Sequence, residues 1–150
     1  MTKLDQLKQL EKDLELIPNS ELFISTSDKE RFSKDFYEYS PILKNHLADC
    51  IADLVVRPCS IEAASSIAGL CHKYGIPLTL RGSGTGNYGQ CVPLMGGVVM
   101  VMNGLREIKQ FNPSTGEVTV ETGCLLRDLN EELINHGRQL RLLPSTWRSA

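Results

Sequence analysis

The chain has 150 residues, of which 41% are hydrophobic and 23% charged, a composition typical of soluble globular domains and unlike that of disordered or fibrous chains. Sixteen basic and eighteen acidic residues leave a formal charge of −2, and neither sign forms a long block, which argues against nucleic-acid and membrane binding. Charges interrupt the apolar residues of the first sixteen positions, and no apolar run is long enough to cross a bilayer, so we expect a cytoplasmic protein.

The five cysteines are widely spaced, odd in number and form no Cys-x-x-Cys pair. This pattern indicates a reducing compartment and cysteines that serve as small packing residues. Cys71 and His72 are adjacent, but no second close pair of ligands accompanies them. We therefore expect no metal site.

The first fifty residues show helical patterns. Apolar residues at spacings of three and four predict a helix over residues 3–17, which we expect to pack on its own domain and not to act as a separate dimerisation helix. Ser27 and Glu30 resemble a capping box that opens a second helix toward Tyr39, and Pro41 is expected to break this helix.

A strand, a helix and a second strand follow in that order. The run Leu54 to Val56 predicts a buried strand, Ser60 is expected to cap a helix that ends at Gly75, and the second strand covers residues 77–81. A right-handed crossover in such a βαβ unit makes the two strands parallel. A glycine-rich loop begins where the second strand ends.

The second half predicts a buried strand over residues 98–102, a local strand pair over 107–110 and 117–121, and a helix over 125–136. The whole is an α+β fold, with an N-terminal helical segment over residues 1–50 and one domain over residues 51–150. Apolar residues and the only tryptophan run up to the last residue, so we expect this domain to be incomplete at its C-terminal end.

The glycine-rich loop carries the candidate chemistry. Residues 82–89 hold four glycines in eight positions, and glycine lets a backbone pass through positive φ and approach a ligand closely. Successive N–H groups in such a nest bind phosphates, and Ser83, Thr85 and Asn87 add side-chain donors, a set that suits a diphosphate. A surface loop whose glycines serve only its turns remains the alternative.

Two common nucleotide motifs do not explain this loop. Gly84, Gly86 and Gly89 match G-x-G-x-x-G, but the dinucleotide fold needs a helix to begin at the last glycines. Here residues 91–97 contain a proline and lead into a strand. A Walker loop is excluded because no Gly-Lys-Ser or Gly-Lys-Thr follows.

The run Arg-Gly-Ser-Gly-Thr-Gly at 81–86, preceded by Tyr-Gly-Ile-Pro-Leu at 74–78 and followed by Pro-Leu and Gly-Gly at 93–97, resembles the FAD-binding domain of the vanillyl-alcohol-oxidase or PCMH type. The resemblance covers residues 53–150, and Tyr-Ser-Pro at 39–41 is similar to the approach in glycolate-oxidase-like members. It implies the first βαβ subdomain plus part of the second subdomain.

The resemblance also implies a cofactor site for FAD. Arg81 would brace the loop, and the FAD pyrophosphate would be surrounded by Gly82, Ser83, Gly84, Thr85, Gly86, Asn87 and Tyr88. A later stretch is similar to the family segment that precedes a Thr-Ile-Gly-Gly element, absent here, and it adds Pro144, Ser145 and Thr146. Some members attach the flavin covalently through a loop histidine, and because this loop has none, we expect noncovalent binding.

The implied reaction transfers a hydride from a small-molecule substrate to the flavin. A 2-hydroxy acid is suggested, although residues 87–90 depart from the Leu-Ser-Gly-Gly of many members. No catalytic residue is evident, so we expect these to come from a later substrate domain and the chain to be inactive alone.

Two alternatives to this function stay open. The first is a stand-alone flavin or nucleotide module that works with a separate chain, and the second is an inactive remnant with exposed strand edges around residues 98–102.

Overall fold

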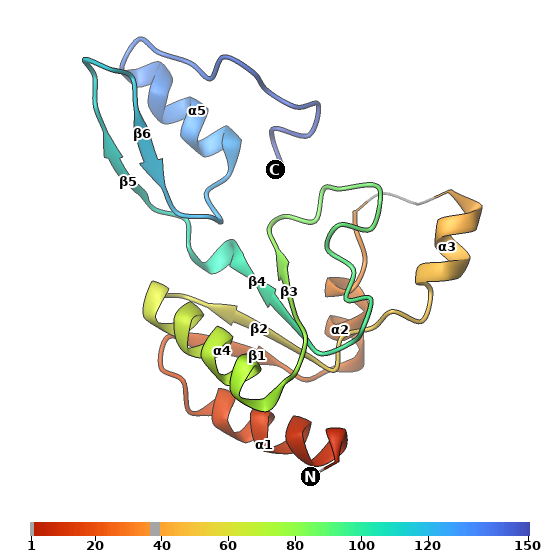
Figure 1. Ribbon diagram of the computed structural model, residues 1–150. Coiled ribbons are helices and arrows are strands. Elements are labelled where there is room, and N and C mark those ends of the chain that lie inside the picture. Colours follow the sequence, from red (N-terminus) through yellow and green to blue (C-terminus); the bar gives the residue numbers. More distant parts are fainter. Residues whose placement is uncertain (1, 37–39) are drawn as a thin grey trace.

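The fold combines a four-stranded sheet, a two-stranded sheet and five α-helices, which confirms the predicted α+β class (Figure 1). Figure 1 shows the computed structural model, which describes residues 2–36 and 40–150. The elements are α1 (Lys3–Glu15), β1 (Ser20–Phe23), α2 (Thr26–Phe32), α3 (Pro41–Leu47), β2 (Leu54–Pro58), α4 (Ile61–Tyr74), β3 (Leu78–Arg81), β4 (Val98–Val101), the 3-10 turn η1 (Met102–Gly104), β5 (Ile108–Phe111), β6 (Val118–Val120) and α5 (Leu126–Asn135).

The larger sheet has the strand order β1-β2-β4-β3. Strands β2 and β3 both pair in parallel with β4, so the predicted parallel βαβ unit is confirmed, with β4 inserted between its two strands. All four residues of β4 are buried, as expected for an apolar strand covered on both faces. The predicted exposed edge around residues 98–102 is therefore wrong, because β4 is paired on both sides and the edge strands are β1 and β3.

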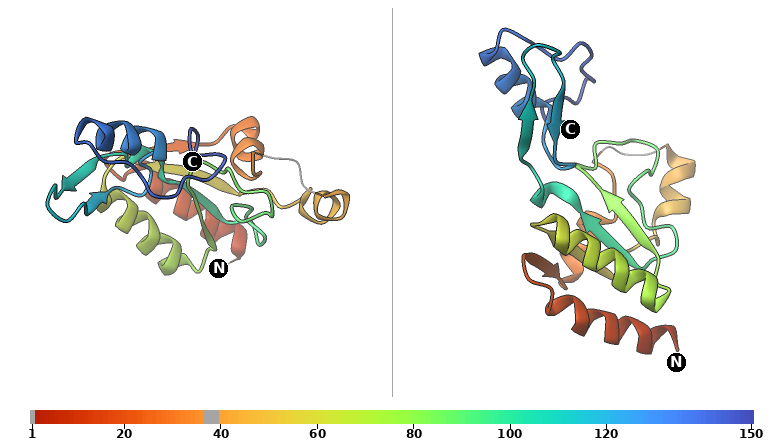
Figure 2. Two further views of the ribbon diagram at one scale, coloured as in Figure 1. Left: turned by 90° about the horizontal axis from the view of Figure 1, so that it is seen from above. Right: turned by 60° about the vertical axis from the view of Figure 1, so that its left-hand side comes forward.

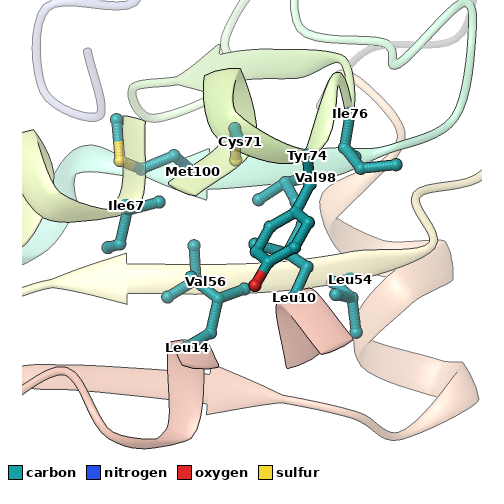
Figure 3. Close-up of a cluster of buried hydrophobic side chains, with 10 residues drawn as sticks. All are labelled: Leu10, Leu14, Leu54, Val56, Ile67, Cys71, Tyr74, Ile76, Val98 and Met100. Carbon is teal, nitrogen blue, oxygen red and sulfur yellow. The ribbon is translucent and has the colours of Figure 1, made fainter. Parts of the chain in front are cut away.

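Helices cover both faces of this sheet (Figure 2). On one face, α1 and α4 pack over a core in which Leu10 and Ile67 are completely buried (Figure 3). On the other face, Phe32 of α2 packs against a cluster that contains Val55 and Val99. The prediction that the first helix packs on its own domain is confirmed.

The second predicted helix differs at both ends. It begins after Ser25, whose hydroxyl accepts a 3.1 Å hydrogen bond from the Asp28 amide, so the capping box at Ser27 and Glu30 is wrong. A serine and an acidic residue with the same spacing lie two positions earlier and cap the helix there. The helix ends at Phe32, and the predicted end at Tyr39 lies outside the described residues.

Pro41 begins a helix and does not break one. It is the first residue of α3, where a proline loses no intrahelical hydrogen bond because the first N–H groups have no partner in the helix. Ser40 caps this helix through a 3.3 Å hydrogen bond from the Leu43 amide.

Strand β1 was not predicted, so the description of residues 1–50 as helical missed one element. It pairs antiparallel with β2, with Phe23 opposite Val55. Four residues with only weak alternation give little local signal, and the partner strand lies more than thirty residues away. The division of the chain at residue 51 stays a prediction.

The C-terminal part forms a smaller unit at the end of the parallel strands (Figure 1). Strands β5 and β6 pair antiparallel, and the turn between them is closed by a 2.8 Å hydrogen bond from the Gly116 amide to the Asn112 carbonyl. Helix α5 buries Leu129 and Leu133. The predicted local strand pair and its helix are confirmed.

A hydrogen bond between Tyr74 and Asp13 ties α1 to α4 and provides a test of this packing. The Tyr74 hydroxyl donates to the Asp13 carboxylate at 2.6 Å, and this bond, followed by one from Gln9, lowers the pKa of Asp13 below its usual value. A carboxyl group with a lowered folded pKa stabilises the fold above its unfolded pKa, and this contribution is lost as the pH falls through the folded value.

We therefore expect Tyr74→Phe to lower the melting temperature by roughly 2–5 °C at pH 7. The difference from the parent chain should shrink as the pH falls below the usual carboxyl value of 3.8. Thermal unfolding followed by circular dichroism across this pH range measures both quantities. A difference that stays constant as the pH falls well below that value would contradict the assignment.

Candidate functional site

The glycine-rich loop of residues 82–89, called here the glycine loop, lies at one edge of the larger sheet. It follows β3, and the turn η1 follows the neighbouring parallel strand β4, so both leave the sheet at the same edge. Ligands of parallel sheets bind in crevices outside the carboxyl ends of the strands. The sheet topology therefore places the glycine loop where a ligand site is expected.

The glycines of the loop meet different requirements. Gly84 has φ +71°, and a Cβ there would lie 2.0 Å from Nη2 of Arg81. At Gly86 a Cβ would lie 2.4 Å from the side-chain oxygen of Gln90. Gly82 has an ordinary φ, and a Cβ there would meet no atom within 4 Å, so the fold itself does not require a glycine at this position.

The donors of the loop are available to a ligand. Within the described part of the chain, the backbone N–H groups of residues 83–87 donate to no protein acceptor. The hydroxyls of Ser83 and Thr85 likewise bond to no residue that the structure describes. A short segment with several unused N–H and O–H donors is the arrangement that binds phosphate oxygens.

A pocket of about 220 Å³, called here the loop pocket, opens beside these donors. Its walls come from four segments: the glycine loop, the turn η1, the connection between β6 and α5, and the C-terminal segment. The lining residues are Gly82, Ser83, Thr85, Asn103, Thr122, Gly123, Cys124 and Ala150. The sequence pointed to the first three and missed the others, because only the tertiary fold brings the four segments together.

Gly123 shows why the third wall lies so close. A Cβ at this position would lie 2.1 Å from the carbonyl oxygen of Met102, and the Gly123 amide donates to the Leu105 carbonyl at 2.7 Å. Only a glycine allows the connection to pack directly on η1. The glycine between a predicted strand and a predicted helix was the available signal.

Asn103 adds a polar atom to the same pocket. Its side-chain oxygen is buried and has no hydrogen-bond partner among the residues that the structure describes. Buried polar groups in native proteins are normally satisfied by protein, water or ligand. The loop pocket thus combines unused donors with an unsatisfied buried amide group.

A second pocket of about 390 Å³, called here the terminal pocket, joins the two predicted parts of the site. It is lined by Thr85, Asn87, Ser145 and Thr146. Figure 1 shows the C-terminal segment running back toward the glycine loop. Hydrogen bonds hold this segment, including one of 2.8 Å from the Leu126 amide to the Ala150 carbonyl.

Five predicted site residues line neither pocket. Arg81 is 7% exposed and donates a 2.7 Å hydrogen bond to the Lys34 carbonyl, which places its guanidinium within the protein. Tyr88 is 73% exposed, and Pro144 is also exposed. Gly84 and Gly86 shape the loop without lining either pocket.

The two pockets are lined by uncharged residues. Burial, followed by the nearby Asp128 and Glu121 carboxylates, raises the pKa of the Cys124 thiol in the loop pocket. A larger pocket of about 520 Å³ lies between the start of α4 and strands β5 and β6, and in it Lys109 pairs with Glu107 and Glu121.

Metal-binding clusters and membrane-spanning helices are both absent from the described parts, residues 2–36 and 40–150. No cluster of three or more histidine, cysteine, aspartate or glutamate side chains is placed to hold a metal ion there. None of the helices there has the length and apolar character needed to span a bilayer. A cytoplasmic location stays a prediction.

Comparison with known proteins gives a family for the larger part of the chain. The family model described as an FAD binding domain matches residues 52–150. The chain is 39% identical over 93 residues to the glycolate oxidase subunit GlcD of Escherichia coli (strain K12), covering 62% of this chain and 19% of that protein. It is 29% identical over 144 residues to a mitochondrial D-lactate dehydrogenase [cytochrome] of Arabidopsis thaliana, and the matched region covers 96% of this chain and 25% of that protein.

Solved structures share the fold at low sequence identity. An alkyldihydroxyacetonephosphate synthase superposes with a TM-score of 0.79 and 17% identity over 95% of this chain and 30% of its own. A p-cresol methylhydroxylase with bound substrate superposes with a TM-score of 0.73 and 13% identity, covering 98% of this chain and 27% of that protein. The chain thus spans about a fifth to a third of the proteins it matches.

These matches confirm the predicted FAD cofactor and the predicted fold class. The family match, together with a glycine loop at the carboxyl ends of parallel strands, agrees with the resemblance seen in the sequence. The chain therefore belongs to the FAD-binding domain family and has the fold of the PCMH-type flavoproteins.

Proposed function

We propose that this chain holds FAD noncovalently, with the pyrophosphate against residues 82–87, as the cofactor-binding part of an oxidoreductase that acts on a 2-hydroxy acid. When bound, the flavin supplies the acceptor for a hydride from the substrate. The residues of this chain would bind and orient the cofactor. The proposal concerns that binding step, because the two pockets present no acid, base or activated nucleophile.

The observation that carries the proposal is Gly82. The fold tolerates a side chain at this position, yet the residue is a glycine in the wall of the loop pocket. A Cβ there would meet no protein atom within 4 Å, at a position that directly precedes the unused loop donors. A glycine that the fold does not require is explained by a ligand that must approach the backbone.

The residues around Gly82 also fit a diphosphate. Neutral N–H and O–H donors of residues 83–87 match phosphate oxygens, and dipoles of this kind bind anions without a lysine or arginine. Ser145 and Thr146 add hydroxyls on the other side of the terminal pocket. Asn103 also lines the loop pocket, but its unsatisfied buried oxygen is an acceptor, so only its NH2 group could donate to a phosphate.

Noncovalent attachment is supported by the chemistry of the pocket residues. Neither pocket is lined by a histidine or tyrosine. Cys124 lines the loop pocket, but burial and two nearby carboxylates raise the pKa of its thiol. Because the thiolate is the reactive form, this cysteine is a poor nucleophile toward a flavin.

A 2-hydroxy acid substrate is supported by the names of the relatives. They are a glycolate oxidase subunit, D-lactate dehydrogenases and probable D-2-hydroxyglutarate dehydrogenases. These proteins are four or more times longer than the shared region, so we propose that residues outside this chain, in the same or a separate polypeptide, contact the substrate.

Flavin retention by the purified chain tests the proposal. The chain is mixed with FAD, freed of unbound flavin by gel filtration, and examined by visible absorbance and by quenching of flavin fluorescence. We expect FAD to be retained and riboflavin, which lacks the pyrophosphate, to bind at least about tenfold more weakly. A folded chain that retains no FAD, or that binds the two flavins equally, would overturn the assignment of the glycine loop.

A second step addresses the substrate. Glycolate, D-lactate or D-2-hydroxyglutarate is added without oxygen to the chain with its retained FAD. Bleaching of the flavin absorbance would show that the chain alone is active. Retained flavin without bleaching would support a substrate site contributed from outside this chain.

A further inference from the structure

A short segment outside the matched domain contacts the glycine loop. Residues 32–36, called here the support segment, precede residue 52, where the family match begins. The Phe36 amide donates a 2.6 Å hydrogen bond to the Gly84 carbonyl, near the middle of the loop. The Gly89 amide donates at 2.9 Å to the Asp35 carboxylate, at the far end of the loop.

The first end of the loop is tied to the same segment. The Arg81 guanidinium donates to the Lys34 carbonyl at 2.7 Å and to the Phe32 carbonyl at 3.3 Å. It also packs against Gly84, where any added Cβ would overlap it. The support segment therefore holds the glycine loop near its start, middle and end, through Phe32 and Lys34 on Arg81, Phe36 on Gly84 and Asp35 on Gly89.

The support segment is itself fixed to the larger sheet. The Ser33 hydroxyl accepts a 2.8 Å hydrogen bond from the Ala52 amide and donates a 2.6 Å bond to the Lys29 carbonyl. Ser33 is 1% exposed, and the Phe32 ring packs against the buried cluster beneath the sheet. Because the support segment is anchored to the sheet, its hydrogen bonds to the glycine loop restrict the movement of that loop.

None of these contacts uses a backbone amide of residues 83–87. They involve the amide of Gly89 and the carbonyl of Gly84, whereas the unused amides belong to residues 83–87. Asp35 is 8% exposed, so its carboxylate bonds the loop from within the protein. A binding loop held in its bound shape loses less conformational entropy when the ligand binds.

We infer that Asp35 is a positioning residue for the flavin pyrophosphate and that the support segment belongs to the FAD site although the family match begins after it. The inference rests on the proposed function. Asp35 acts through Gly89, keeping the glycine loop in the conformation in which its amides are free to receive phosphate.

Three variants test this inference. Asp35→Ala removes the acceptor for the Gly89 amide, and Asp35→Asn keeps an oxygen that can accept the same hydrogen bond. Asp13→Ala is the matched control, because Asp13 also bonds across two elements but lies on α1, at the opposite face from α2. Each variant is titrated with FAD, and its thermal unfolding is measured without FAD.

We expect Asp35→Ala to weaken FAD binding by about tenfold, the size of one hydrogen bond to a charged group. Asp35→Asn should recover most of this loss, and Asp13→Ala should bind FAD as the parent chain does. Hydrogen exchange of a peptide spanning residues 82–90, measured without FAD, should be faster in Asp35→Ala and unchanged in Asp13→Ala.

Parent-like FAD binding by Asp35→Ala would overturn the inference, as would equal losses of affinity in Asp35→Ala and Asp13→Ala. If Asp35→Ala does not fold, Asp35→Asn decides the question: any loss of FAD affinity that remains in this variant must be accompanied by faster exchange of residues 82–90, and a loss of affinity without faster exchange would overturn the inference. A parent chain that does not bind FAD would instead contradict the proposed function, so the two failures are distinguishable.

Discussion

Replacing Gly84 by valine is expected to abolish FAD retention, with a loss of affinity of roughly a hundredfold or more. Gly84 has φ +71°, a conformation that a β-branched residue rarely adopts. Its Cβ would lie 2.0 Å from the Arg81 guanidinium, which two backbone carbonyls of the support segment hold in place. The variant must therefore either move Arg81 or change the path of the loop.

The matched control is Gly69→Val. Gly69 lies in α4, and a Cβ there meets no atom within 4 Å. Valine is no worse than glycine inside a helix, so this variant should fold and keep its FAD. Gel filtration with absorbance detection compares the two. Equal flavin retention by both variants would contradict the role of the glycine loop.

The second large effect concerns the start of β4, where Gly97→Ala is expected to destabilise the fold by roughly 3–5 kcal/mol. Gly97 has φ +78°, and its Cβ would lie 2.2 Å from the Pro77 carbonyl oxygen. That oxygen accepts a 2.8 Å hydrogen bond from Val98, and the Gly97 carbonyl accepts bonds from Asp53 and Leu54. The contacted atoms are backbone atoms at the start of the parallel strands, so they cannot move aside independently.

Gly75→Ala separates the two causes of this loss of stability, which are the positive φ of Gly97 and the overlap of an added Cβ with the Pro77 carbonyl. Gly75 also has a positive φ, of 64°, at the end of α4, but its Cβ would meet nothing within 4 Å. It should cost about 1 kcal/mol, the conformational part alone. Urea unfolding of both variants gives the difference. If the two losses were equal, the overlap with Pro77 would not contribute.

The elements with strong local signals were predicted correctly from the sequence. The helix ending at Gly75, the buried strand at residues 98–101 and the helix before Gly137 all carry apolar periodicity with a glycine or proline nearby. Errors occurred where local signals competed. Two serines lie close enough together to cap α2, and Ser25 does so, while Pro41 suits a helix start as well as a helix end.

Half of the candidate site was also evident before the fold was known. The glycine loop has an unusual local composition, and its resemblance to FAD-binding domains led to Ser145 and Thr146, which line a pocket with Thr85 and Asn87. Asn103 and Gly123 could not be assigned in this way. Each belongs to a short connection without its own motif and reaches the pocket only because β4 and β6 end near the loop.

The sequence by itself determined the α+β class and the glycine loop that we propose binds a pyrophosphate, because periodicity, capping residues and glycine spacing act over a few neighbouring residues. The FAD cofactor followed from the resemblance of this loop and its flanking residues to a known family. Only the tertiary structure decided that β4 is an interior strand, that β1 extends the sheet and that Asp35 holds the glycine loop. These contacts join residues twenty or more positions apart. Their partners are chosen by the packing of the whole sheet, which no local pattern encodes.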